Sequence, residues 1–277
     1  MNKYSPIILI RGGGDLASGV ALRLHRAGLK LLITEHPQPL AVRRLVSFAE
    51  AVYRGTYSVE DVHARLVQNL NEVSNIIDRH EIPVFIDPSC EYVLDPRSPL
   101  PAPLALIDAR MTKRPPDLGI DAAPLVIGLG PGFSAGMNCH AAIETNRGHY
   151  LGRVIWEGSP QADTGIPGTV AQYQKKRVLR APTNGFIQTQ VEIGDRVQKG
   201  QVIAVVEGQK IIATLDGILR GLLHDGLPVQ QGLKVGDIDP RDDPRFATTV
   251  SEKSLAIGGG VLEALLSHSE IRKRLWN

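Results

Sequence analysis

Short apolar runs alternate with helical patterns along the first half of the chain. Residues 6–10 form an apolar run typical of a buried parallel strand, and residues 31–34 form a second one. Between them, residues 20–27 carry apolar side chains at helical spacing, and Gly28 is a natural place for that helix to end. The pattern predicts a β-α-β unit at the start of the chain.

Three more apolar runs continue the series, at residues 82–86, 104–107 and 125–129. Residues 36–80 carry apolar positions at helical spacing and are expected to be mostly helical. Strands that alternate with helices favour a parallel sheet. We therefore expect an α/β fold, with residues 1–175 forming a Rossmann-like domain around a parallel sheet.

An internal repeat with an offset of 32 residues lies between residues 178 and 240. Because glycines and their neighbours recur at turn positions, the repeat predicts two similar β units packed face to face. The matched glycines are Gly185 and Gly217, Gly194 and Gly226, and Gly200 and Gly232.

The repeat is similar to biotinyl and lipoyl carrier domains, which implies a barrel-sandwich hybrid over residues 176–240. The turn between Ile203 and Ala213 is shorter than in carriers, and Lys210 lies past its apex. We therefore expect a structural or docking module without a carrier lysine. Residues 241–277 are expected to form a helical tail that packs back on the α/β domain.

A glycine-rich segment follows the first strand. Gly12, Gly14 and Ala17 fit the spacing of the dinucleotide fingerprint, in which a tight turn brings a phosphate to a helix N-terminus. Glu35 ends the second strand, where an acidic residue meets ribose hydroxyls and favours NAD or a similar nucleotide. The alternative is that the glycines only let helix and strand pack closely and that Glu35 is a surface acid.

A second glycine-rich loop follows the strand at 125–129. Arg147 and His149 lie downstream and can supply positive charge or a proton relay near neutral pH. The alternative is a turn-rich connection in which Arg147 pairs with Glu144. Asp108, at another strand end, is either a ligand contact or a capping residue.

The predicted binding residues therefore lie in the two glycine-rich loops and at strand ends. They are Gly12, Gly13, Gly14, Asp15, Ala17, Ser18, Gly19, Glu35, Asp108, Lys113, Gly128, Gly130, Pro131, Gly132, Asn138, Glu144, Thr145, Arg147, His149, Thr164 and Gly165. Arg147 and His149 are also the candidates for catalysis, and whether the chain is an enzyme stays open.

Composition narrows the class of protein. The 277 residues carry 31 basic and 29 acidic side chains in a scattered order, which predicts no nucleic-acid surface. The apolar runs are far shorter than the roughly 18–20 residues of a membrane span. Cys90 and Cys139 have no metal-ligand spacing, so we expect no metal site, and they indicate a reduced, cytoplasmic chain without a disulfide framework.

Several segments in this order look like the YqeB family of accessory proteins for selenium-dependent molybdenum hydroxylases. They are Ile10–Gly19, Asp108–Ala109 with Lys113–Arg114, Gly128–Phe133, Glu144–His149 and Ala256–Glu263. The family is loosely similar to XdhC-type maturation proteins.

The resemblance implies a maturation factor that binds a nucleotide or a molybdopterin-type cofactor at its glycine-rich loops. Its implied partners are a client molybdenum hydroxylase and other maturation proteins, and a homodimer stays open. Two alternatives remain, an NAD-dependent oxidoreductase and a non-catalytic scaffold that docks the client. A dehydrogenase needs a proton donor beside the nicotinamide, and His149 is the one histidine in a motif-like setting.

Overall fold

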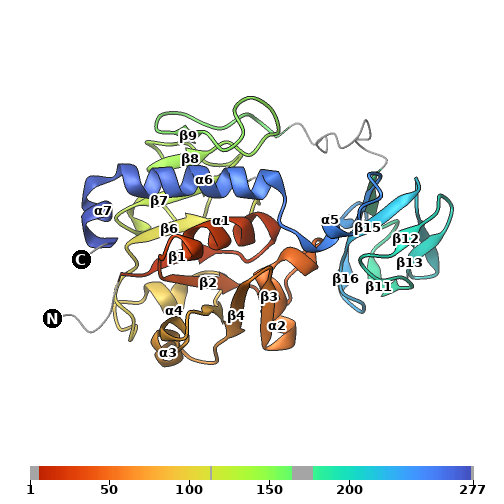
Figure 1. Cartoon of the computed structure of the whole chain (residues 1–277), viewed down its shortest axis with the longest axis horizontal. Coiled ribbons are helices and arrows are strands. Elements are labelled where there is room, and N and C mark those ends of the chain that lie inside the picture. The colour runs from red at the N-terminus through yellow and green to blue at the C-terminus, as the bar shows by residue number, and fades with distance from the viewer. Residues whose placement is uncertain (1–5, 113, 164–176, 276–277) are drawn as a thin grey trace. The chain divides into compact units, whose positions relative to one another are not determined.

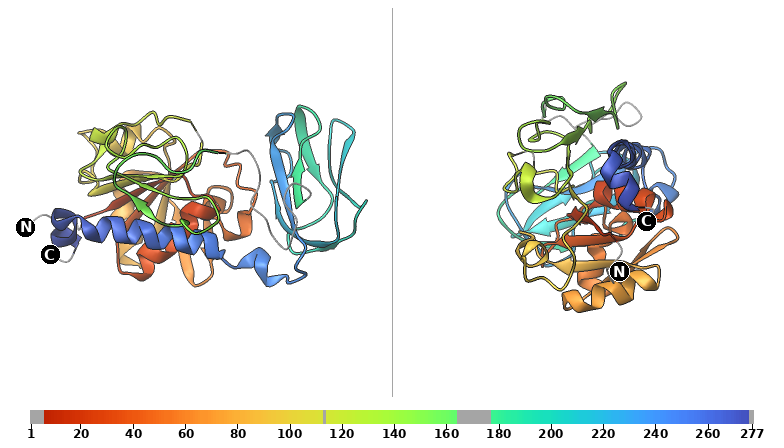
Figure 2. Two further views of the ribbon diagram at one scale, coloured as in Figure 1. Left: turned by 90° about the horizontal axis from the view of Figure 1, so that it is seen from above. Right: turned by 90° about the vertical axis from the view of Figure 1, so that its left-hand side faces the viewer.

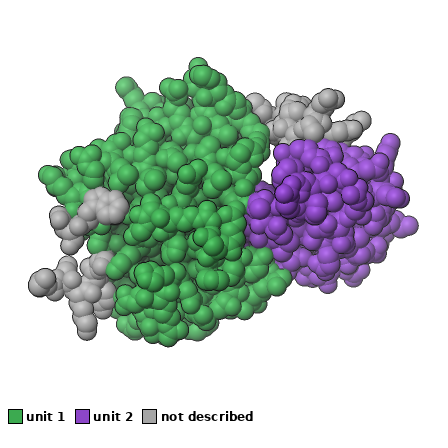
Figure 3. Space-filling view, in the orientation of Figure 1, with its two compact units in different colours: residues 1–39, 48–163, 250–277 green, residues 40–47, 164–249 purple. Residues whose placement is uncertain are grey.

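The computed structural model describes residues 6–112, 114–163 and 177–275. The chain divides into two compact units (Figure 3). Unit 1 comprises residues 1–39, 48–163 and 250–277, and unit 2 comprises residues 40–47 and 164–249. These divisions differ from the predicted boundaries, because residues 40–47 and 241–249 both belong to unit 2.

Unit 1 is built on a nine-stranded mixed sheet with the order β3-β4-β5-β2-β1-β6-β7-β8-β9 (Figure 1). All neighbours from β4 to β8 pair in parallel, whereas the edge strands β3 and β9 pair antiparallel to β4 and β8. The strands are β1 (Ile8–Arg11), β2 (Leu31–Glu35), β3 (Thr56–Val59), β4 (Val62–Leu66), β5 (Ile82–Ile86), β6 (Ala105–Asp108), β7 (Val126–Leu129), β8 (Ala141–Ile143) and β9 (Val154–Ile155).

Helices and 3₁₀ turns connect these strands. They are α1 (Asp15–Arg26), η1 (Arg44–Val46), η2 (Phe48–Glu50), α2 (Ala51–Arg54), η3 (Leu70–Glu72), α3 (Val73–Asp78), α4 (Glu91–Leu94), η4 (Ile120–Ala122), α5 (Arg245–Thr248), α6 (Glu252–Ser267) and α7 (Ser269–Leu275). The predicted β-α-β unit is confirmed as β1, α1 and β2, and β1 pairs in parallel with β2.

The expectation of mostly helical structure over residues 36–80 is wrong. Strands β3 and β4 form a hairpin there, with a turn in which Glu60 has a φ of 54°. In β4, Val62 and Ala64 are buried and His63 between them is exposed, which is the two-residue period of a strand. The apolar positions satisfied a helical spacing as well, so spacing alone did not separate the two structures.

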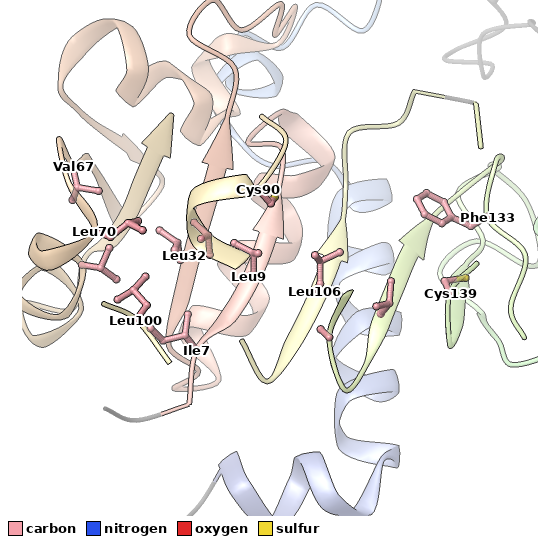
Figure 4. Close-up of a cluster of buried hydrophobic side chains, with 14 of the residues drawn as sticks. Ile7, Leu9, Leu32, Val67, Leu70, Cys90, Leu100, Leu106, Phe133 and Cys139 are labelled. Carbon is pink, nitrogen blue, oxygen red and sulfur yellow. The ribbon is translucent and has the colours of Figure 1, made fainter. Parts of the chain in front are cut away.

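Helices cover both faces of the sheet in unit 1. Helix α1 packs on β1 and β2, and α6 packs on β7, β8 and β9. The opposite face carries an apolar cluster that includes residues of α3 and α4. Figure 4 shows Leu32, Leu9 and Leu106 of that cluster side by side on three adjacent strands. Both faces of the central strands are therefore buried, as the unbroken apolar runs predicted.

Helix α6 lies along α1 at very short range (Figure 1). A Cβ atom on Gly258 would lie 2.9 Å from the Gly19 carbonyl oxygen, and one on Gly19 would overlap Ser254. Helices α6 and α7 lie within the predicted tail of residues 241–277, whereas residues 241–249 belong to unit 2. The glycines of residues 258–260 are explained in part by this close crossing.

Unit 2 contains two four-stranded antiparallel sheets, ordered β10-β17-β15-β12 and β14-β13-β11-β16. The strands are β10 (Val178–Arg180), β11 (Gly185–Thr189), β12 (Arg196–Val197), β13 (Val202–Val206), β14 (Gln209–Ile212), β15 (Gly217–Leu222), β16 (Pro228–Val229) and β17 (Lys234–Asp239).

The internal repeat is visible in the strands of unit 2. Strand β11 begins at Gly185 and β15 at Gly217, and both glycines have a positive φ, of 148° and 157°. Contrary to the expectation from the sequence, the two halves do not form separate units packed face to face. Each sheet takes two strands from β10–β13 and two from β14–β17, so the halves are interleaved.

The predicted fold class is therefore wrong. The sheet of unit 1 is mixed, because a hairpin and the strand β9 add antiparallel edges to it. Unit 2 is a pair of antiparallel sheets, and nothing establishes the predicted biotinyl- or lipoyl-like barrel-sandwich hybrid. No helix among the described residues is long and apolar enough to cross a membrane.

Candidate functional site

The carboxyl ends of β2, β1, β6, β7 and β8 meet at one edge of the mixed sheet, because these strands are parallel. Most of the predicted site residues lie at this edge. They include the Gly12–Gly14 turn after β1, Glu35 at the end of β2, Asp108 at the end of β6, Gly130–Gly132 after β7, and Glu144–Thr145 after β8.

The three glycines of the turn after β1 have different surroundings. Gly12 has a φ of 95°, which favours glycine, and Arg110 lies against it. Gly13 is enclosed, since a Cβ atom there would lie 2.9 Å from the Ala49 nitrogen. At Gly14, the residue before α1, a Cβ atom would meet no neighbouring atom within 4 Å. Open space therefore lies at the N-terminus of α1, at Gly14.

The next three predicted site residues, in helix α1, serve packing. Ala17, Ser18 and Gly19 are all buried in α1. The Ser18 hydroxyl donates to the Gly13 carbonyl at 3.1 Å and accepts from the Phe48 N–H at 2.8 Å. These contacts support the close-packing alternative for this part of the motif. Asp15 begins α1 and is half-buried.

Glu35 is turned toward the glycine-rich turn. Its carboxylate accepts hydrogen bonds from the Gly13 N–H at 2.6 Å and from the His36 N–H at 2.7 Å. Burial raises the pKa of Glu35, and the two backbone donors oppose that rise. In this conformation Glu35 occupies a backbone donor of the turn, so contact with a ribose hydroxyl stays a prediction.

Two arginines and two aspartates form a charge network at the same edge, which we call the Arg11 network. Arg11 ends β1 and is 1% exposed, and the paired residue on β6 is Asp108. Arg110 donates to both oxygens of the Asp108 carboxylate, at 2.6 and 3.0 Å. Arg11 instead donates through both Nη atoms to Asp117, at 2.6 and 2.8 Å.

Sequence reasoning found Asp108 but missed Arg11, Arg110 and Asp117. Arg11 was overlooked although a charged residue at the end of a buried strand is a usable signal. Hydrogen bonds from Arg11 are the largest influence on the pKa of Asp117 and lower it. Burial raises this pKa, Arg110 lowers it further, and the net effect holds it far below its usual range. Asp117 is therefore ionised at neutral pH.

The glycines of the second loop are enclosed by neighbouring atoms. A Cβ atom on Gly128 would overlap Phe133, and one on Gly130 would overlap the Thr145 hydroxyl. Gly132, with a φ of 105°, lies against the backbone of Arg114.

Side chains complete this second loop. Asn138 accepts from the Ser134 N–H at 2.8 Å and donates to the Gly132 carbonyl at 3.1 Å. Pro131 between the glycines is half-buried. The contacts support a tightly packed connection, and binding at these glycines stays a prediction.

The polar segment after β8 is held by its own contacts. Glu144 accepts from the backbone N–H groups of Asn146, at 2.7 Å, and Gln161, at 2.8 Å. Arg147 forms an ion pair with Glu252 in the first turn of α6, not with Glu144. His149 is exposed and packs edge-on to Tyr150, with 5.3 Å between ring centres. Their roles in catalysis stay predictions.

The remaining candidates are three residues that the structure does not describe and the two cysteines. Lys113, Thr164 and Gly165 lie outside the described residues. Burial raises the pKa of both Cys90 and Cys139 to about 11, so both thiols are protonated at neutral pH. Over the described parts of the chain, no group of three or more His, Cys, Asp or Glu side chains could hold a metal ion.

The fold and this edge define a two-unit α/β protein whose glycine-rich turn lies beside paired arginines. No protein-family model matches the chain. YqeB of Escherichia coli (strain K12), described as uncharacterized, is 48% identical over 260 residues. The match covers 94% of this chain and 47% of YqeB, so the chain spans about half the length of that relative. This similarity supports membership of the chain in the YqeB family.

Solved structures give weaker likenesses. An aspartoacylase family protein from Mesorhizobium loti has 15% identity and a TM-score of 0.27, with 85% of each chain covered. A succinylglutamate desuccinylase/aspartoacylase from Rhodobacter sphaeroides has 13% identity and a TM-score of 0.26, with 86% of this chain and 87% of that chain covered. Scores this low define neither the fold nor the activity of this chain.

The molybdenum cofactor chemistry implied by the resemblance needs correction. The curated relative is described as uncharacterized, so the similarity in sequence assigns no molybdenum chemistry to this chain. No feature of the described residues is specific for molybdenum. We therefore do not retain molybdenum cofactor as a ligand.

Proposed function

We propose that this chain binds a nucleotide, or a related phosphate-bearing ligand, at the carboxyl edge of its mixed sheet and acts as an accessory protein. The client in this proposal is a hydroxylase, the class of partner that the family resemblance implied. A cytoplasmic location, predicted from the composition, belongs to the same proposal.

One observation carries the binding part of the proposal. The space beside Gly14 is open, at the point where α1 begins. The first N–H groups of a helix have no partners within the helix, and its dipole favours an anion there. The backbone and Cγ of Arg110 lie against Gly12, and its guanidinium is paired with Asp108 and Asp117. An anionic group is therefore the ligand chemistry that this edge fits.

Gly14 also offers a direct test. Its φ of −65° suits any residue, so Gly14→Val introduces a side chain into the open space without straining the turn. Gly259→Val is the matched control, since Gly259 in α6 also has no atom within 4 Å of a Cβ position. Thermal unfolding of the three proteins is measured with NAD(H), NADP(H), ATP, CTP and GTP.

A nucleotide at 100 times its dissociation constant adds about 2.7 kcal/mol, which raises the melting temperature by roughly 5–10 °C. We expect such a rise for wild type and Gly259→Val, and its loss in Gly14→Val. No rise with any nucleotide, or an equal rise in Gly14→Val, contradicts the proposal. A rise with NAD(H) alone, together with turnover of a carbonyl substrate, would favour an oxidoreductase instead.

A further inference from the structure

The strongest unassigned feature of unit 1 is the way Asp117 fills the Arg11 network. Its carboxylate oxygens accept three hydrogen bonds from two guanidinium groups, at 2.6, 2.7 and 2.8 Å. Two parallel N–H donors on one carboxylate form the geometry with which arginine recognises carboxylates and phosphates. Asp117 thus occupies a built oxyanion site.

The two partners of this contact differ in their surroundings. The Arg11 side chain is 1% exposed, whereas the Asp117 side chain is 60% exposed. Asp117 comes from the loop between β6 and β7, 106 residues from Arg11. The buried component is therefore the cation, and the anion is supplied by a surface loop.

Arg11 needs an anion at this position. Its Nε atom donates to the Pro88 carbonyl at 2.9 Å, but the nearest Asp108 oxygen is 3.6 Å from its Nη1 atom. The Asp108 carboxylate is already held by Arg110. Loss of Asp117 would leave the buried Arg11 with only the Asp108 carboxylate, which Arg110 shares, so a group that displaces Asp117 must replace its charge.

We propose that Asp117 is an internal substitute for a phosphate group. When a ligand binds, its phosphate displaces the Asp117 carboxylate from Arg11 and Arg110. This deepens the proposed function, on which it rests for the rest of the ligand. A phosphate offers the arginines at least two oxygens in the place of the carboxylate, and more negative charge. Asp117 competes with it at the high effective concentration of a group in the same chain.

Inorganic phosphate is the probe that isolates this step. Binding is measured by calorimetry on the full chain at constant ionic strength, for wild type, Asp117→Ala and Asp117→Asn. We expect both variants to bind phosphate at least roughly tenfold more tightly than wild type, because the internal competitor is gone. Phosphate should also restore any melting temperature that the variants lose. Arg110→Gln in the Asp117→Ala background should reverse most of the gain.

Asp95→Ala is the matched control. Asp95 forms a comparable two-bond pair with Arg97, but Arg97 is 90% exposed and needs no replacement anion. We expect no gain in phosphate affinity for this variant. Equal phosphate affinity in wild type and both Asp117 variants overturns the proposal, and so does a gain for acetate without one for phosphate.

The outcomes separate this inference from the proposed function. A gain in phosphate affinity in Asp117→Ala, without binding of any nucleotide, supports the role of Asp117 as an internal substitute and contradicts nucleotide binding. Nucleotide affinity that is equal in wild type and Asp117→Ala supports the proposed function and contradicts the displacement of Asp117 by the ligand.

Discussion

The Oε2 atom of Glu35 accepts a hydrogen bond of 2.6 Å from the backbone N–H of Gly13. A carboxylate at the end of β2 therefore binds the turn that follows β1, where the dinucleotide motif has phosphate oxygens. Because burial raises the pKa of Glu35, this contact is sensitive to pH.

Glu35→Gln is expected to change how stability depends on pH. A raised folded pKa means that folding disfavours the ionised form, so Glu35 lowers the free energy of unfolding as pH rises from its unfolded pKa to its folded one. The stability of Glu35→Gln relative to wild type should therefore increase across that window. Urea unfolding at intervals above about pH 4 measures it, and a relative stability that falls with pH would contradict the assigned direction.

The crossing of α1 and α6 predicts opposite effects at adjacent glycines. A methyl group on Gly258 would lie 2.8 Å from Arg23 Cγ and 2.9 Å from the Gly19 oxygen, whereas one on Gly259 meets no atom within 4 Å. Gly258→Ala should cost about 1–3 kcal/mol through overpacking. Gly259→Ala should gain about 0.5–1 kcal/mol from helix propensity. Urea unfolding followed by circular dichroism compares them, and equal effects would exclude the close crossing.

The two thiols are expected to resist modification in the folded chain. Burial raises the pKa of Cys90 and Cys139 to about 11, and the thiolate is the reactive form. Dithionitrobenzoate at pH 8 should react at least ~100-fold more slowly with the native protein than with the protein in urea. Met137→Cys, at a position that is 78% exposed, is the control that should react quickly. Rapid native reaction of the wild type would disprove burial of the thiols.

Unit 2 has a buried ion cluster around Asp237. Arg220 donates to the Asp237 carboxylate at 2.5 and 3.1 Å, and Arg177 also forms an ion pair with it. Asp237→Asn removes a charged counterion from the buried arginines. It should therefore lower the free energy of unfolding by about 3–5 kcal/mol.

The control for Asp237 is an exposed pair in the same unit, Asp242 with Arg196. Asp242→Asn should change stability by less than about 1 kcal/mol, because water screens that pair. Thermal unfolding followed by circular dichroism compares the two variants. Similar small losses would show that the Asp237 cluster contributes no more than a surface pair.

The sequence by itself determined the features that depend on local periodicity. The apolar runs located β1, β2, β5, β6 and β7, since a strand buried on both faces is continuously apolar. The offset of 32 residues located the repeat of unit 2, because turns that need a positive φ recur as glycines. Because the predicted strands are parallel, the sequence also placed the two glycine-rich loops at the same edge of the sheet.

Tertiary structure alone decided the partners of each segment. Whether residues 56–66 became a hairpin or a helix depended on the neighbouring strand β5, and the interleaving of unit 2 depended on pairing between its halves. Arg11 and Asp117 meet across 106 residues, and Glu35 turns back on Gly13 instead of facing outward. Periodicity reports which side of an element is buried, but the free energy of these contacts depends on groups brought together only by folding.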